Sequence, residues 1–229
     1  MKNNNNQSIR KDWELIQNLI EQKRKILDIG CGEGGLIKKL QKNIHSDARG
    51  IEVNGDFVRK ALSFGLCVVQ GDAEKDLDQY SDNSFDYVIL SQTLQAMYNP
   101  RDVLLEMLRI GSKVIVSFPN FGHWQIRTKL LLTGKMPITK GLPYTWYETP
   151  NIHFFTLKDF QEMCNDYKIF IEKSIGLTSN GKQFDIINNS LSANLITSEA
   201  IFLLTKKTYE PIKLKSKKIS HSSQIVFSK

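Results

Sequence analysis

The regular alternation of short apolar runs with segments of helical period restricts the fold of this chain most. Five short apolar runs predict strands in the first half, at residues 25–29, 48–53, 66–70, 85–91 and 113–118. The segments between them repeat apolar residues every three or four positions, which is typical of helices packed on one face. Strands that alternate with helices indicate βαβ units and a mainly parallel sheet.

The pattern changes after residue 120. Residues 121–155 are rich in glycine, proline and aromatic residues and have little clear period, so we interpret them as an insertion that carries binding surface. Thr156 and Asp159 form a capping pair that predicts a helix over 157–166. Two further strands are predicted at 168–175 and 200–206, with a polar loop or hairpin over 176–194 between them.

These segments predict one domain over residues 12–205, which begins with an amphipathic helix over 12–23. A polar tail precedes it at 1–11, and a basic, disordered tail follows at 206–229. The net charge is +7, but seven lysines and one glutamate from residue 206 onward account for +6 of it. Because the domain itself is almost neutral and such charged blocks are usually disordered, we do not expect nucleic acid to be the partner.

Composition excludes several other classes of protein. No run of 18 apolar residues occurs, so we expect no membrane span, and the polar N-terminus has no apolar signal segment. The three cysteines, Cys31, Cys67 and Cys164, form no C-x-x-C pair. This indicates a reducing compartment, the cytoplasm, and neither a disulfide framework nor a metal site.

The strongest local signal is the end of the first strand, Ile26-Leu27-Asp28-Ile29-Gly30-Cys31-Gly32-Glu33-Gly34-Gly35. Its glycines allow a sharp turn and let a ligand approach the backbone, and the helix that follows points its amides toward the crevice. Glu52 ends the next strand, where a carboxylate can accept hydrogen bonds from two ribose hydroxyls. The two features together predict a nucleoside site at the carboxyl edge of an open sheet.

The charges in this turn decide between two kinds of nucleoside. Gly30, Gly32 and Gly35 match the G-x-G-x-x-G pattern of dinucleotide folds. However, Asp28 and Glu33 flank the turn, and each would repel a pyrophosphate by about 4 kcal/mol at ~4 Å and an effective dielectric near 20. S-adenosylmethionine (SAM), which carries an ammonium and a sulfonium, fits these acids better.

Residues 25–120 resemble a class I SAM-dependent methyltransferase domain, in which Asp28, Gly30, Gly32, Glu52, Asp72 and Asp86 match the motifs. The resemblance implies a Rossmann-like α/β fold. Its sheet would have seven mainly parallel strands, the last of them antiparallel, with helices on both faces. It also implies that SAM or S-adenosylhomocysteine binds at Asp28, Gly30, Cys31, Gly32, Glu52, Val53, Asp72, Ala73, Ser91 and Gln92. Asp72 would accept from the adenine amino group, and Asp86 would be structural.

A closer resemblance covers residues 25–205 and rests on longer strings. Ser91-Gln92-Thr93-Leu94-Gln95-Ala96, Val116–Trp124 and Leu142–His153 are similar to the methionine biosynthesis protein MetW family. The resemblance implies a role in making methionine, as an accessory or activating partner of homoserine O-acyltransferase.

The alternative is a catalytically active SAM-dependent methyltransferase that acts on a small molecule. His123, His153 and Tyr144 are the candidate catalytic residues, with Tyr147 and Trp146 as an aromatic wall. A general base is needed only when the nucleophile must lose a proton. The same aromatic residues also suit a protein interface, so the residues alone leave open whether the chain is an enzyme.

Overall fold

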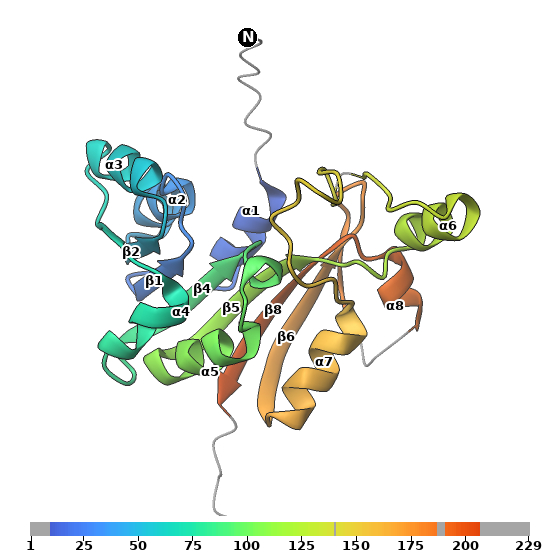
Figure 1. Ribbon diagram of the computed structural model, residues 1–229. Helices are drawn as coiled ribbons and strands as arrows, with labels where there is room; N and C mark the ends of the chain where they lie inside the picture. The colour runs from blue at the N-terminus through green and yellow to red at the C-terminus, as the bar shows by residue number, and fades with distance from the viewer. Residues whose placement is uncertain (1–9, 140, 187–190, 207–229) are drawn as a thin grey trace, which may run out of the picture.

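The computed structural model describes residues 10–139, 141–186 and 191–206, which form one twisted sheet between two layers of helices (Figure 1). The strands are β1 (Lys25–Ile29), β2 (Asp47–Glu52), β3 (Val68–Gln70), β4 (Phe85–Ser91), β5 (Gly111–Pro119), β6 (Ile169–Leu177), β7 (Gln183–Asp185) and β8 (Glu199–Lys206). The α-helices are α1 (Lys11–Asn18), α2 (Gly35–Ile44), α3 (Gly55–Ser63), α4 (Ala73–Asp76), α5 (Pro100–Ile110), α6 (Trp124–Thr133), α7 (Leu157–Asp166) and α8 (Leu191–Ile196). Two short 3-10 helices, η1 and η2, cover Leu77–Gln79 and Leu94–Ala96.

The strand order across the sheet is β3-β2-β1-β4-β5-β8-β6-β7. The pairs from β3 to β5 are parallel, and β8 runs antiparallel to both of its neighbours, β5 and β6. This confirms the mainly parallel sheet with an antiparallel last strand. The number of strands was wrong: the described residues hold eight rather than seven, because β7 pairs with β6 at the edge.

The core lies on both faces of the sheet because the central strands are apolar at successive positions. One face packs against α5 and α7, with Leu27, Val88 and Val114 facing those helices. The other face packs against α1, α2 and α3, with Ile26, Ile89 and Ile115 facing them. Since successive strand residues point to opposite faces, this covering explains why β4 is almost continuously apolar.

Side-chain caps mark where α7 and α3 begin. At α7, the Thr156 side chain accepts from the Asp159 amide and the Asp159 carboxylate accepts from the Thr156 amide, which confirms the predicted capping box. At α3, Asn54 caps the first turn by accepting from the amide of Asp56 at 2.9 Å. The predicted helix over 12–23 is shorter than expected, since α1 ends at Asn18.

The least regular parts of the sequence contain structure that the periodicity did not indicate. Helix α6 lies inside the 121–155 insertion, β7 lies inside the 176–194 loop, and α8 begins in that loop and ends two residues beyond it. No helix among the described residues is long and apolar enough to cross a bilayer. Residues 1–9 of the predicted N-terminal tail and 207–229 of the predicted basic tail lie outside the described residues.

The order of strands determines where a ligand can bind. The chain moves outward from β1 to β2 and β3, then returns to β4 on the other side of β1. At such a switch point the loops after neighbouring strands diverge and leave a crevice at their carboxyl ends. The glycine turn after β1 lies at this edge.

Candidate functional site

A cavity of about 700 Å³ opens at the carboxyl ends of the first four strands. Every segment that follows one of these strands contributes to its wall. The lining residues are Gly30, Gly32, Ile51, Glu52, Val53, Phe57, Gly71, Asp72, Ala73, Glu74, Lys75, Thr93, Ala96, Met97, Tyr98 and Asn99. The structure therefore brings six of the ten predicted cofactor residues to one cavity: Gly30, Gly32, Glu52, Val53, Asp72 and Ala73.

The glycine turn forms one wall because its backbone adopts a conformation that side chains disfavour. Gly30 and Gly32 have φ of 66° and 56°, in the left-handed region that glycine enters at little cost. A Cβ at Gly30 would lie 3.2 Å from the Thr93 side chain. A Cβ at Gly32 would meet nothing within 4 Å, so the backbone there faces open space.

Glu52 is held at the end of β2 by the turn itself. Its Oε2 accepts from the Gly32 amide at 2.8 Å, and its Oε1 accepts from the Asn54 amide at 2.9 Å. Each carboxylate oxygen can accept more than one hydrogen bond. The buried Glu52 carboxylate is thus fixed in orientation and retains acceptor capacity toward the cavity.

Asp72 has a structural role beside its place on the cavity. It is the N-cap of α4, where Oδ1 accepts from the Glu74 amide at 3.0 Å, and Oδ2 pairs with Lys75 Nζ at 2.7 Å. The hydrogen bond from Lys75, followed by that from the Glu74 amide, lowers the pKa of Asp72. Asp72 therefore stays ionised at neutral pH.

The loop after β4 closes the cavity with Thr93 and the segment 96–99, whereas the cofactor residues predicted at this end of β4 were Ser91 and Gln92. Glu74 joins α4 to this loop: its Oε1 and Oε2 accept from the amides of Asn99 and Tyr98, at 2.6 and 3.1 Å. Apolar side chains exposed on the wall include Phe57 at 42% and Val53 at 65%. Flat apolar walls with a few fixed polar groups are typical of ligand pockets. The carboxyl-end rule for open sheets could have predicted the residues after β4.

Asp28 does not line the cavity but belongs to a buried ionic cluster beside it. We define this buried ionic cluster as the buried carboxylates Asp12 and Asp28 together with the half-buried Arg10, Ser91 and Glu199. Arg10 donates to Asp12 Oδ1 from Nε at 3.1 Å and to Ser91 Oγ from Nη2 at 2.8 Å. The Ser91 hydroxyl donates to Asp12 Oδ2 at 3.0 Å.

One arginine thus lies among three carboxylates in this cluster, and burial raises the pKa of two of them, Asp28 and Glu199. Burial raises the pKa of Asp28 to about 7, with the Arg10 charge opposing the shift and those of Glu52 and Asp12 adding to it. Burial also raises the pKa of Glu199 to about 7, with Asp12 adding to the shift. Both carboxyls therefore carry a fractional charge near neutral pH. A cation that reached the cluster would favour their ionised forms.

Three other predicted cofactor residues also lie off the cavity. The Cys31 Sγ packs toward Gly50, and burial raises the pKa of this thiol to about 12. Ser91 belongs to the buried ionic cluster. Gln92 has φ of 57°, and its Nε2 donates to Glu199 at 2.6 Å. That Asp28, Cys31, Ser91 and Gln92 contact a cofactor stays a prediction.

Asp86 and Glu33 lie apart from the cavity. Asp86 is the second residue of β4, at the opposite ends of the strands from the cavity, and its Oδ2 accepts from the Lys25 amide at 2.8 Å. It therefore joins the beginnings of β1 and β4. Glu33 pairs with Lys60 at 2.6 Å on the surface. The negative charge on the cavity wall comes instead from Glu52, Asp72 and Glu74, opposed by one lysine, Lys75.

None of the three candidate catalytic residues lines the cavity. His123 is buried as the N-cap of α6, where its Nδ1 accepts from the Gln125 amide and its Nε2 lies 3.3 Å from Ser179 Oγ. Burial lowers its pKa. His153 Nε2 lies 3.3 Å from the carbonyl oxygen of Tyr98, at the cavity rim. Tyr144 is exposed.

The fold of the chain is shared with solved methyltransferases. A SAM-dependent methyltransferase from Thermotoga maritima superposes with a TM-score of 0.62 at 16% identity, over 85% of this chain and 87% of that one. One from Methanosarcina mazei gives 0.58 at 20% identity, over 84% and 96%. The cyclase SpnF gives 0.61 at 16% identity, over 86% and 80%. These likenesses show a methyltransferase fold, and the cyclase shows that the fold alone does not fix a reaction.

Sequence comparisons are more specific. A bifunctional methionine biosynthesis protein MetXA/MetW from Rhodopirellula baltica is 32% identical over 173 residues, which are 72% of this chain. The chain spans only 28% of that relative's length. Residues 10–204 match the profile of the family described as methionine biosynthesis protein MetW. The match begins at Arg10 of the buried ionic cluster and includes every cavity residue, and the chain therefore belongs to the MetW family.

Proposed function

We propose that the cavity binds SAM or S-adenosylhomocysteine. The open backbone at Gly32 provides room for a ligand against the turn, and the fixed Glu52 carboxylate suits a ribose diol. Val53 and Phe57 offer apolar surface for a purine, beside the ionised Asp72. The excess of carboxylates over cations on the wall favours a positively charged adenosine derivative over a diphosphate.

We further propose that the chain acts as an accessory or activating partner of homoserine O-acyltransferase in methionine biosynthesis. The observation that carries this proposal is the relative named MetXA/MetW, in which a MetW-like segment shares one polypeptide with a second protein, MetXA. Joining two modules on one chain gives them a high effective concentration, which suits modules that act together. The three cysteines are unpaired, which supports a reducing compartment such as the cytoplasm.

The site geometry favours this accessory function over methyl transfer to a small molecule. A catalytic base must come within hydrogen-bond reach of the reacting group. Among the described residues that line the cavity there is no histidine; His123 is engaged as a helix cap, and His153 lies at the rim with its Nε2 3.3 Å from the Tyr98 carbonyl oxygen. The acids on the wall are engaged with backbone amides or with Lys75.

The test of this proposal combines binding with activity. The purified chain is mixed with homoserine O-acyltransferase from the same organism, with and without SAM, and both complex formation and acylation of homoserine are measured. We expect a complex and faster acylation when the chain is present. Unchanged acylation and no complex would reject the accessory function. A new methylated product from SAM and cell extract would favour the enzymatic alternative.

A further inference from the structure

Helix α6 is well formed but packs only loosely against the described residues, with a cavity lined by Trp124, Thr128 and Ser179 at its side. His123 caps its start, and Gly134, with φ of 63°, ends it by donating to the Leu130 carbonyl at 2.9 Å. None of its ten residues is buried. Figure 1 shows α6 projecting from the sheet on the side away from α2 and α3. A helix usually gains most of its stability by packing an apolar face, which α6 does not do here.

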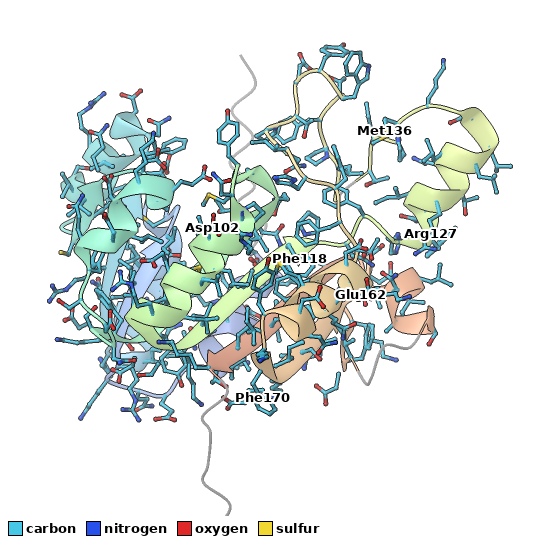
Figure 2. The ribbon with its side chains drawn as sticks, turned by 60° about the horizontal axis from the view of Figure 1, so that its bottom comes forward. Asp102, Phe118, Arg127, Met136, Glu162 and Phe170 are labelled. Atoms are coloured by element: carbon cyan, nitrogen blue, oxygen red, sulfur yellow. The ribbon has the colours of Figure 1, made fainter. Side chains whose placement is uncertain are left out.

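The exposed surface of α6 is apolar. Leu131 and Leu132 are 84% and 77% exposed, and Trp124 and Leu130 are about half exposed. Met136, in the loop after the helix, is also exposed and lies beside α6 in Figure 2. Large exposed patches of this kind mark interaction sites on soluble proteins.

The base of α6 is held firmly to the body of the protein. Arg127 Nε donates to the Gly122 carbonyl at 2.6 Å, and the Gly122 amide donates to the buried Asn120 Oδ1 at 2.9 Å. Lys129 Nζ donates to the Ile138 carbonyl at 3.3 Å, which ties the following loop to the helix. A rigid projecting helix loses little conformational entropy when it binds.

The distribution of apolar residues indicates the shape of the partner. Trp124, Ile126, Leu130, Leu131 and Leu132 lie around the helix rather than along one face. A membrane surface contacts one face of a helix and therefore selects helices with a strong apolar side. A groove in a protein can surround a helix on several sides. The pattern on α6 fits a groove.

The charge of the segment indicates the chemistry of that groove. The insertion over residues 121–155 contains Arg127, Lys129, Lys135 and Lys140 and one acidic residue, Glu148. The complementary surface is therefore apolar with a rim of carboxylates. A second copy of this chain fits poorly, because a two-fold contact would place the same cations opposite one another.

We propose that α6 is the docking element of this chain and inserts into an apolar, acid-rimmed groove on the acyltransferase. This inference rests on the proposed accessory function. The acyltransferase is the partner because the MetXA/MetW relative carries both modules on one chain, and because α6 offers the rigid apolar surface that such an association needs.

The experiment compares two variants of the full chain. Leu131→Ser/Leu132→Ser removes the most exposed apolar side chains of α6, and Leu62→Ser removes an exposed leucine of α3 as a matched control. All three sites are exposed, so circular dichroism should show a wild-type fold. Calorimetric titration with the acyltransferase should give a Kd at least about 30-fold weaker for the α6 variant and within about twofold of wild type for Leu62→Ser. Lys135→Glu should weaken binding, and the loss should shrink at high salt.

The outcomes separate this inference from the function it rests on. If wild type binds and the α6 variant binds equally well, the docking site is wrong while the accessory function stands, and Trp146→Ala then tests the other exposed part of the insertion. If wild type does not bind, both fail. Two further results would overturn the inference. One is α6-dependent binding to phosphatidylcholine–phosphatidylserine vesicles without acyltransferase binding. The other is an α6-dependent dimer in light scattering.

Discussion

Replacing Gly32 by valine tests the ligand site at its most exposed backbone position. Gly32 has φ of 56°, and a Cβ there would meet no atom within 4 Å. The substitution therefore causes no clash in the protein, but it places a side chain in a left-handed conformation, which costs about 1–2 kcal/mol of folding free energy. It also places three carbon atoms where the proposed ligand approaches the turn.

Gly65 provides a matched control for the backbone cost. It lies between α3 and β3, has φ of 74°, and a Cβ there also meets nothing within 4 Å. Gly65 does not line the cavity. Gly65→Val should therefore lose the same ~1–2 kcal/mol of stability and keep its affinity for SAM.

The two effects are measured separately. Urea denaturation gives the free energy of unfolding of each variant, and isothermal titration gives the Kd for SAM. We expect similar destabilisation of both variants and at least about 100-fold weaker binding for Gly32→Val alone, since overpacking and lost contacts add about 3 kcal/mol. If Gly32→Val binds SAM as wild type does, the ligand does not contact this turn and the site is wrong.

Three further predictions concern charge and hydrogen bonding. Glu52→Ala should weaken SAM by about 1–3 kcal/mol, because a charge-assisted acceptor is lost; calorimetry that gives a wild-type Kd would contradict the ribose role. Because the pKa of Asp28 is about 7, its ionised fraction rises from about a tenth at pH 6 to about half at pH 7, a range in which the ligand's α-ammonium stays mostly protonated, and SAM should bind up to about fivefold more tightly at pH 7 than at pH 6. Asp28→Asn should remove this pH dependence of the Kd. Glu199→Gln shows how much of it comes from Glu199, whose pKa is also about 7. If the Kd of both variants depends on pH as that of wild type does, ionisation of this cluster is not linked to SAM binding. Asn120→Ala should lower the free energy of unfolding by about 2–4 kcal/mol, since it leaves four buried backbone groups without a partner; urea denaturation measures this, and a loss below about 0.5 kcal/mol would show that these groups find other partners.

The sequence predicted the first half of the fold well because its strands are buried on both faces. β1 and β4 begin and end at the predicted residues, because polar residues or glycines on both sides of each apolar run mark where the strand begins and ends. Helix α6 was missed because its apolar residues lie on several sides and give no period. β7 was missed because it has three residues and exists through pairing with β6.

Part of the candidate site could likewise be predicted from the sequence, and part could not. Gly30 and Gly32 come directly after β1, and Glu52 is the last residue of β2. Because the two strands are parallel, their carboxyl ends lie side by side, and these residues are expected to lie close together. The buried ionic cluster could not be predicted, because Arg10 and Ser91 are 81 residues apart in the sequence. The packing of α1 on one face of the sheet brings them together.

The buried ionic cluster beside the cavity is connected to the base of α6 through the ends of β5 and β8. Gln92 donates to Glu199 of the buried ionic cluster, and Glu199 pairs with Pro119 across the two strands. The next residue, Asn120, donates to the Ser198 carbonyl at 2.9 Å and holds the Gly122 turn at the base of α6. We propose that a ligand that changes the charge of Glu199 would act on the segment that positions α6. If the chain binds both SAM and the acyltransferase as proposed, reciprocal linkage requires that the factor by which SAM changes affinity for the acyltransferase equal the factor by which the acyltransferase changes affinity for SAM.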